Sequence, residues 1–194
     1  MLFNERSYSV LVVSSSEKLN SALKTLLTDS QYSPLYFTGS VASAKRHLLE
    51  NTYDFVVINS PLPDDVGTKL AVDVCAGRST VCVLLVRAEQ YEETHAKVVG
   101  HGVFTLPKPI TGTAMSQALK WMAAARERLR RMEKKTISIE EKMEEIRLVN
   151  RAKWMLIDNL KMTESDAHRY IEKQAMDLCV TRREVAEDII KTYN

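Results

Sequence analysis

The 194-residue chain is poor in cysteine and has no long apolar run. Its three cysteines, Cys75, Cys82 and Cys179, are odd in number and form neither a CxxC pair nor a Cys/His spacing typical of zinc sites. We therefore expect free, buried thiols rather than disulfides or a metal site. Because no apolar run is long enough to span a bilayer, we expect no membrane association. Without a signal peptide, we also expect a cytoplasmic protein.

Glycine and proline are scarce, and neither occurs after Gly112. The second half of the chain therefore lacks the residues that most often interrupt helices. The sequence has no Gly-rich phosphate loop, no nucleophile motif and no ligand spacing among its four histidines. We predict a protein that is not an enzyme and has no catalytic residues and no cofactor. The net charge is only +2, so any nucleic-acid surface must come from local clusters of basic residues.

Short apolar runs alternate with helical patterns in the first half of the chain. The runs VLVV, FVVI and VCVLLV are apolar at successive positions, as is typical of strands buried on both faces of a parallel sheet. Their alternation with helices predicts a doubly wound α/β domain, in which ligands bind at the carboxyl ends of the strands. The predicted strands are Ser7–Val13, Ser33–Thr38, Asp54–Asn59, Val81–Val86 and Val103–Leu106; the predicted helices are Lys18–Thr28, Val41–Leu49, Gly67–Cys75, Tyr91–Val98 and one after Pro109.

The residues that follow these strands resemble the response-regulator receiver family of two-component systems, over residues 7–122. VLVV is followed by a pair of small polar residues, FVVI by an amide and a Pro-containing loop, VLLV by a basic residue, and the last strand by Leu-Pro-Lys-Pro. The resemblance implies a five-stranded parallel sheet of the receiver, or flavodoxin-like, type. It also implies a pocket at the position of the phosphoacceptor, made of Ser14, Ser15, Asn59, Arg87 and Lys108.

The chemistry of phosphoryl transfer is absent from this predicted pocket. Asn59 is a neutral amide and cannot form an aspartyl phosphate, which requires a carboxylate nucleophile. Ser14 and Ser15 have no charge with which to hold Mg²⁺. Arg87 stands where a small hydroxyl residue reports the phosphoryl group. We predict a degenerate receiver, in which Arg87 and Lys108 either bind an anion or, as we favour, are solvated side chains at a relic site.

A long helix is predicted to follow this domain. Apolar residues recur every three or four positions from residue 122 onward, which is the heptad pattern of a coiled coil. We predict a coiled-coil linker over residues 114–148 that forms a homodimer; the alternative is packing within one chain. The charged runs Arg126–Arg131 and Glu140–Glu145 are expected to be solvated. The a positions are Met122, Leu129, Thr136, Met143 and Asn150, and the d positions are Ala125, Met132, Ile139 and Ile146.

Asn150 leaves two interpretations open. It either fixes a parallel register from an a position or lies beyond the end of the coiled coil. The sequence pattern does not separate them.

Residues 146–194 read as a bundle of three helices. The first is the continuation of the long helix to about Leu160, and the next two begin at Thr163 and Thr181, each of which starts a capping-box pattern. We expect the second helix to bury Ala167, Ile171, Ala175 and Leu178, and the third to bury Val185, Ile189 and Tyr193.

This segment resembles the ANTAR family, the RNA-binding output domain of bacterial transcription antiterminators. The motifs that carry the resemblance over residues 146–193 are Arg-Ala-Lys-x-x-Leu from Arg151, Met-Thr-Glu-x-x-Ala from Met162, Tyr-Ile-x-x-Gln-Ala-Met from Tyr170 and Val-Ala-x-x-Ile-Ile from Val185. Trp154 departs from the pattern, because many members have Gly there. The resemblance implies binding to RNA hairpins in nascent leader transcripts. Together with the predicted coiled coil, we expect a homodimer to bind them, with RNA polymerase or a sensor protein as further candidate partners.

Seven residues are the predicted RNA contacts. The basic side chains would bind phosphate groups, Tyr170 would stack on an unpaired loop base, and the pair Arg182–Arg183 is the strongest candidate. The set is Arg151, Lys153, Arg169, Tyr170, Lys173, Arg182 and Arg183. Two other functions fit three short helices: a DNA-binding transcription factor and a protein–protein adaptor.

Overall fold

The computed structural model describes residues 7–28, 31–77 and 79–193. The chain divides into two compact units, Met1–Arg131 and Met132–Asn194, and helix α5 (Gly112–Leu160) contributes to both. The boundary falls inside the segment predicted as a coiled-coil linker. Asn194, the last residue of the predicted C-terminal module, lies outside the described residues.

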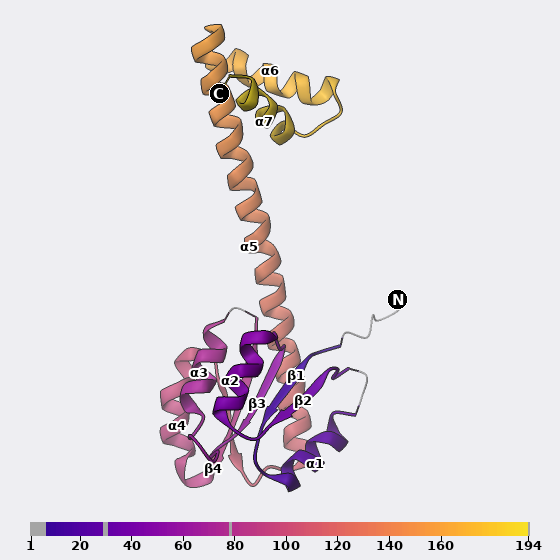
Figure 1. Ribbon diagram of the computed structural model, residues 1–194, viewed down its shortest axis with the longest axis vertical. Coiled ribbons are helices and arrows are strands. Elements are labelled where there is room, and N and C mark those ends of the chain that lie inside the picture. Colours follow the sequence, from indigo (N-terminus) through magenta and orange to yellow (C-terminus); the bar gives the residue numbers. More distant parts are fainter. Residues whose placement is uncertain (1–6, 29–30, 78, 194) are drawn as a thin grey trace. The chain divides into compact units, whose positions relative to one another are not determined.

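The first unit is a five-stranded parallel sheet flanked by helices (Figure 1). The strand order β2-β1-β3-β4-β5 places β3 at the centre, between β1 and β4, and all neighbouring strands are parallel. The predicted α/β class and strand count are confirmed. The elements are β1 (Val10–Val13), α1 (Glu17–Leu26), β2 (Leu35–Thr38), α2 (Val41–Glu50), β3 (Phe55–Asn59), α3 (Thr68–Ala76), β4 (Val81–Arg87), α4 (Tyr91–Val98) and β5 (Phe104–Lys108), with short 3₁₀ turns at Ala88–Gln90 and Val99–His101.

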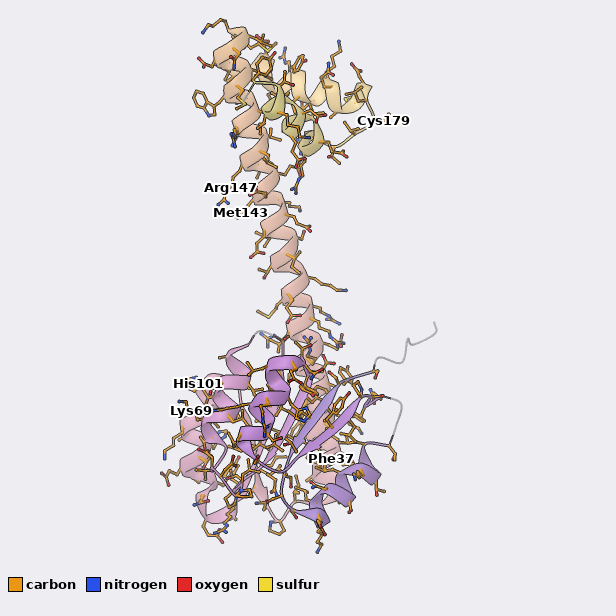
Figure 2. All side chains as sticks on the ribbon, in the orientation of Figure 1. Phe37, Lys69, His101, Met143, Arg147 and Cys179 are labelled. Carbon is orange, nitrogen blue, oxygen red and sulfur yellow. The ribbon has the colours of Figure 1, made fainter. Side chains whose placement is uncertain are left out.

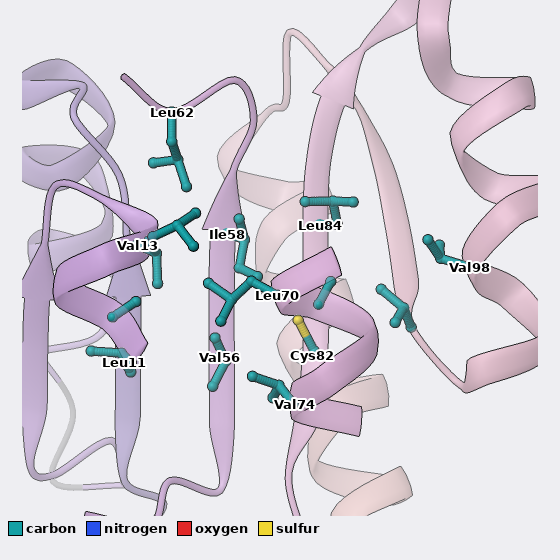
Figure 3. Close-up of a cluster of buried hydrophobic side chains, with 14 of the residues drawn as sticks. Leu11, Val13, Val56, Ile58, Leu62, Leu70, Val74, Cys82, Leu84 and Val98 are labelled. Carbon is teal, nitrogen blue, oxygen red and sulfur yellow. The ribbon is translucent and has the colours of Figure 1, made fainter. Parts of the chain in front are cut away.

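Apolar side chains cover both faces of this sheet, which is why the central strands are apolar at every position. One face packs against α2, α3 and α4, where Leu70 and Val98 meet Ile58 and Leu84 (Figure 3). The other face packs against α1 and the first turns of α5. Burial of each large apolar side chain contributes about 1.5–3 kcal/mol, so the two faces together hold the unit.

The start of α5 belongs to this first unit. Thr111 accepts a hydrogen bond from the backbone N–H of Ala114 and so caps the helix. Met115, Leu119 and Met122 are almost fully buried against the sheet. Met122 was assigned to the coiled-coil seam from its spacing, but its side chain is core of the first unit.

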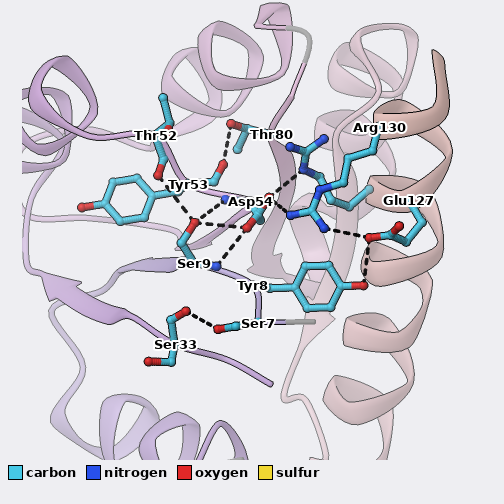
Figure 4. A network of polar contacts seen from close by, with 11 residues as sticks. Ser7, Tyr8, Ser9, Ser33, Thr52, Tyr53, Asp54, Thr80, Glu127 and Arg130 are labelled. Atoms are coloured by element: carbon cyan, nitrogen blue, oxygen red, sulfur yellow. Dashed lines mark hydrogen bonds and ion pairs between the residues drawn. The ribbon is translucent and has the colours of Figure 1, made fainter. Parts of the chain in front are cut away.

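A polar network ties the next two turns of α5 to the start of β3 (Figure 4). Asp54 Oδ1 accepts hydrogen bonds from Arg126 Nε and Arg130, both at 2.8 Å. Asp54 Oδ2 accepts from the backbone N–H of Ser9 at 3.0 Å, and Arg130 also pairs with Glu127 at 2.9 Å. The basic run expected to be solvated is therefore partly internal, because Arg126 is only 8% exposed.

The second unit is the expected bundle of three helices: the last part of α5, α6 (Glu164–Asp177) and α7 (Arg182–Tyr193). Thr163 caps α6 by accepting from the backbone N–H of Asp166. Thr181 and Glu184 form a complete capping box, because the Thr181 hydroxyl accepts from the Glu184 N–H while the Glu184 carboxylate accepts from the Thr181 N–H. The core of the bundle is Ala152, Leu156, Ala167, Ile171, Ala175, Val185, Ala186 and Ile189.

Three predicted burials at the end of this bundle are wrong. Helix α6 ends at Asp177, so Leu178 leaves the buried face and is 63% exposed. Cys179 follows with a positive φ of 53°, and its thiol is exposed rather than buried. Tyr193, in the last turn of α7, is 37% exposed.

Candidate functional site

The carboxyl ends of the strands bring most of the predicted pocket together. Ser14 follows β1, Asn59 ends β3 and Lys108 ends β5. Asn59 Nδ2 donates to Ser14 Oγ at 3.1 Å, and Lys108 Nζ donates to Asn59 Oδ1 at 3.0 Å. Lys108 Nζ also donates to the carbonyl oxygen of Ser60. The amide of Asn59 is thus engaged through both its nitrogen and its oxygen.

The other two predicted pocket residues lie at the rim. Ser15 and Arg87 are exposed. Burial lowers the pKa of Lys108, and the positive charge of Arg87 lowers it further. Lys108 therefore faces neutral oxygens and another cation instead of the acidic cluster that would stabilise its charge.

The acidic side chains that follow Asn59 most closely in the sequence bind backbone groups and do not enter the predicted pocket. Asp64 accepts hydrogen bonds from the backbone N–H groups of Val41 and Ala42, both at 2.9 Å. These bonds, at the N-terminus of α2, lower the pKa of Asp64. Asp65 accepts from the N–H of Gly67 at 2.6 Å. Both carboxylates hold backbone, and in the described residues no group of three or more His, Cys, Asp or Glu side chains is arranged to hold a metal.

The second unit places three predicted contact residues on one side of α6. Arg169 and Lys173 are one helical turn apart and exposed, and Tyr170 beside them is 38% exposed. Neither cation makes an ion pair with any residue that the structure describes. Two uncompensated positive charges next to an accessible aromatic ring are suited to a polyanion that carries bases.

The two basic candidates on α7 are paired with acidic side chains. Arg182 lies 3.1 Å from Glu145 and 3.9 Å from Glu172. Arg183 lies 2.9 Å from Glu187, and this pairing raises the pKa of Arg183.

Two more candidates lie on α5. Lys153 lies 2.8 Å from Glu164, and the resulting hydrogen bond and charge lower the pKa of Glu164. Arg151 is exposed. The sequence could not place Glu145 and Glu172 beside Arg182, because these acids lie on other helices. The Arg183–Glu187 pair lies within α7 at i,i+4 spacing and could have been read from the sequence.

Comparison with known proteins assigns both units. Residues 138–190 match the family model of the ANTAR domain. The C-terminal unit of this chain contains an ANTAR domain. The chain is also similar to the transcriptional regulatory protein PdtaR of Mycobacterium tuberculosis, strains CDC 1551 and H37Rv. Identity to that protein is 26% over 139 residues, which cover 72% of this chain and 68% of PdtaR.

Solved structures assign the N-terminal unit a receiver-like fold. The signal receiver domain of an HD domain-containing protein from Pseudomonas fluorescens Pf-5 superposes with a TM-score of 0.58 at 25% identity, covering 65% of this chain and 93% of that chain. A response regulator receiver domain protein from Clostridium thermocellum superposes with a TM-score of 0.55 at 18% identity, covering 64% and 98%. The ANTAR domain is therefore joined to a receiver-like domain.

Sequence reasoning missed the Asp54 network. Asp54 gave no signal, because a single acidic residue at the predicted start of a strand is also usual in a solvated turn. Its partners lie 72 and 76 residues further along the chain, on a helix whose basic run matched a solvated face.

Among the described helices, none is long and apolar enough to cross a membrane.

Proposed function

We propose that this chain is a transcription antitermination regulator that binds hairpins in nascent leader RNA as a homodimer. The observation that carries the proposal is the exposed group Arg169, Tyr170 and Lys173 on α6 of the ANTAR domain. Loop bases of RNA are unpaired and stack on aromatic side chains, while the adjacent phosphates attract cations. PdtaR, similar over most of this chain, carries the description of a transcriptional regulatory protein.

We rank the proposed RNA contacts by whether an acidic side chain already pairs with them. Arg169, Tyr170 and Lys173 form the primary face. The ion-paired cations contribute once RNA phosphates replace their carboxylate partners. This exchange costs little for Arg182 and Arg183, because exposed ion pairs stabilise by about 0–1 kcal/mol. This secondary group is Lys153, Arg182 and Arg183, and it is completed by Arg151, an exposed residue of α5.

The receiver-like unit, in this proposal, works without phosphorylation. The pocket formed by Ser14, Asn59 and Lys108 supplies neither a carboxylate nucleophile nor carboxylate ligands for Mg²⁺. We propose that the unit acts as a scaffold, or as a sensor whose state depends on association with a partner and not on a phosphoryl group.

RNA binding is tested with the full chain and a leader RNA that carries two hairpins. We expect affinity that falls steeply as salt rises, and about one unit less salt slope for each cation lost in Arg169→Ala and Lys173→Ala. Tyr170→Ala should weaken binding without changing the slope. The matched control is Lys97→Ala, an exposed cation of the first unit.

Each alternative function predicts a different result. Stronger binding to duplex DNA than to the hairpins would favour a DNA-binding factor. Tight binding of a protein partner that ignores salt, with no RNA binding, would favour an adaptor. Either outcome would contradict the proposed antitermination role.

A further inference from the structure

Helix α5 carries a row of large apolar side chains that nothing in the described second unit covers. We call it the α5 stripe: Met132, Ile139, Met143, Ile146 and Trp154, which are between 48% and 70% exposed. In this unit α5 packs against α6 and α7 through Ala152 and Leu156, which are buried. Met143 and Arg147 project from the side of α5 that faces away from α6 and α7 (Figure 2).

The stripe does not coincide with the heptad seam read from the sequence. Met122 is fully buried against the sheet of the first unit, and Leu129 packs on the same core, so the first heptad is already occupied within the chain. At the other end, α5 continues without a break to Leu160, and Asn150 is exposed. The available surface therefore runs from Met132 to Trp154, about 33 Å at 1.5 Å per residue.

Trp154 extends the stripe for a geometric reason. A heptad repeat predicts Lys153 at the d position, but Lys153 turns toward α6, where its Nζ lies 2.8 Å from Glu164. An α-helix drifts by about 20° per heptad from a strict seven-residue repeat. Three heptads after Met132, this drift brings Trp154, at the e position, closer to the line of the stripe than Lys153.

We infer that a second copy of this chain docks on the α5 stripe in parallel and in register, with each Trp154 packed against the partner's Val149. The inference rests on the proposed dimer and moves its seam about one heptad toward the C-terminus, into the ANTAR domain. Asn150, at an a position of this seam, pairs with its counterpart and favours the parallel register.

Two of the three flanking pairs along the stripe fit this arrangement. In a parallel pair each g residue lies beside the e residue five positions later in the partner. Lys135 then meets the partner's Glu140, which joins opposite charges. The part of Val149 that its own bundle core leaves accessible meets the partner's Trp154, which is 70% exposed in the single chain. Lys142 beside the partner's Arg147 is the one unfavourable pair among the three.

Sedimentation equilibrium of the full chain tests the position of the seam. We expect Trp154→Ala to raise the dimer Kd at least tenfold and Ile139→Asn to abolish the dimer. Trp121→Ala is the matched control, because Trp121 is 54% exposed on the same helix but in the first unit, and it should leave the Kd unchanged. Circular dichroism checks that each variant is folded.

Two results would overturn the inference in distinguishable ways. If Ile139→Asn dissociates the dimer but Trp154→Ala behaves as the wild type, the proposed dimer stands and its extension into the ANTAR domain is wrong. If the wild-type chain is a monomer at every concentration tested, the proposed dimer is wrong as well.

Charge reversal tests the parallel register. Lys135→Glu places like charges beside the partner's Glu140 and should weaken the dimer, and Glu140→Lys in addition should restore it. Residues five apart on one helix are not neighbours, so rescue reports the contact between chains. A double variant no tighter than Lys135→Glu alone would indicate an antiparallel pair and would overturn the proposed register.

Discussion

Asp54 and Lys108 are two charged side chains of the same unit in opposite electrostatic situations. Burial alone would raise the pKa of Asp54, but hydrogen bonds from Arg126 and Ser9 and the charge of Arg130 lower it overall. Lys108 has no such compensation, and burial together with Arg87 lowers its pKa. The Asp54 network therefore stabilises the fold, whereas the pocket around Lys108 holds a charge that its neighbours do not balance.

Asp54→Asn should destabilise the first unit. Removing one partner of a buried ion pair costs about 3–5 kcal/mol, and we expect about 3 kcal/mol because Arg130 is partly exposed. Hydrogen exchange of the buried β3 amides measures the loss at pH 7. Asp73→Asn, an exposed carboxylate on α3, is the matched control and should have no effect.

Comparison of the wild type with Asp54→Asn also tests how the stabilisation by Asp54 depends on pH. Because the folded-state pKa of Asp54 is lowered, its contribution is complete above the unfolded value of about 3.9 and is lost as pH falls through the folded pKa. The stability difference between wild type and Asp54→Asn should thus be constant from about pH 5 to 8 and shrink below about pH 4. A difference that persists unchanged at pH 2 would contradict this account.

Among the secondary-structure elements, features set by neighbouring residues were predicted from the sequence, whereas features set by contacts between distant residues were missed. The strands of the first unit and the starts of α6 and α7 follow from apolar runs and capping residues, which act within a few positions. Met122 was misassigned because helical periodicity marks a buried face but does not tell whether a partner helix or the chain's own sheet covers it. Arg126 was misassigned because its partner, Asp54, lies 72 residues earlier in the chain. Leu178 was misassigned because α6 ends one residue before it.

The capping box of α7 supplies a prediction at this scale. Thr181→Ala removes the side-chain acceptor for the Glu184 N–H and should destabilise the start of α7 by about 1 kcal/mol. Amide exchange in the first turn of α7 should become about fivefold faster. Thr192→Ala, which removes only a hydroxyl bonded to the Asp188 carbonyl near the end of the same helix, should leave that turn unchanged. Equal exchange in Thr181→Ala and wild type would show that the box does not hold the helix start.

Considered as a whole, the molecule combines a receiver-like fold with an ANTAR domain, and α5 belongs to both units. Phosphorylation controls a receiver only if a carboxylate accepts the phosphoryl group and other carboxylates hold Mg²⁺. The residue that we predict at the acceptor position is Asn59, whose nitrogen donates to Ser14 and whose oxygen accepts from Lys108. The proposed control of the output therefore depends on association of α5 and not on a phosphoryl group.

Treatment of the full chain with acetyl phosphate and Mg²⁺ should therefore leave its mass, its dimerisation and its RNA binding unchanged. We expect the intact mass, the dimer Kd and the affinity for hairpin RNA to stay the same. Asn59→Asp should behave identically, because Ser14 and Ser15 still supply no carboxylate for the metal. A receiver domain with a complete acidic pocket, treated in parallel, should gain one phosphoryl group. The same gain mapped by mass spectrometry to the first unit of this chain would show that another residue accepts the phosphoryl group, and control by association alone would then be wrong.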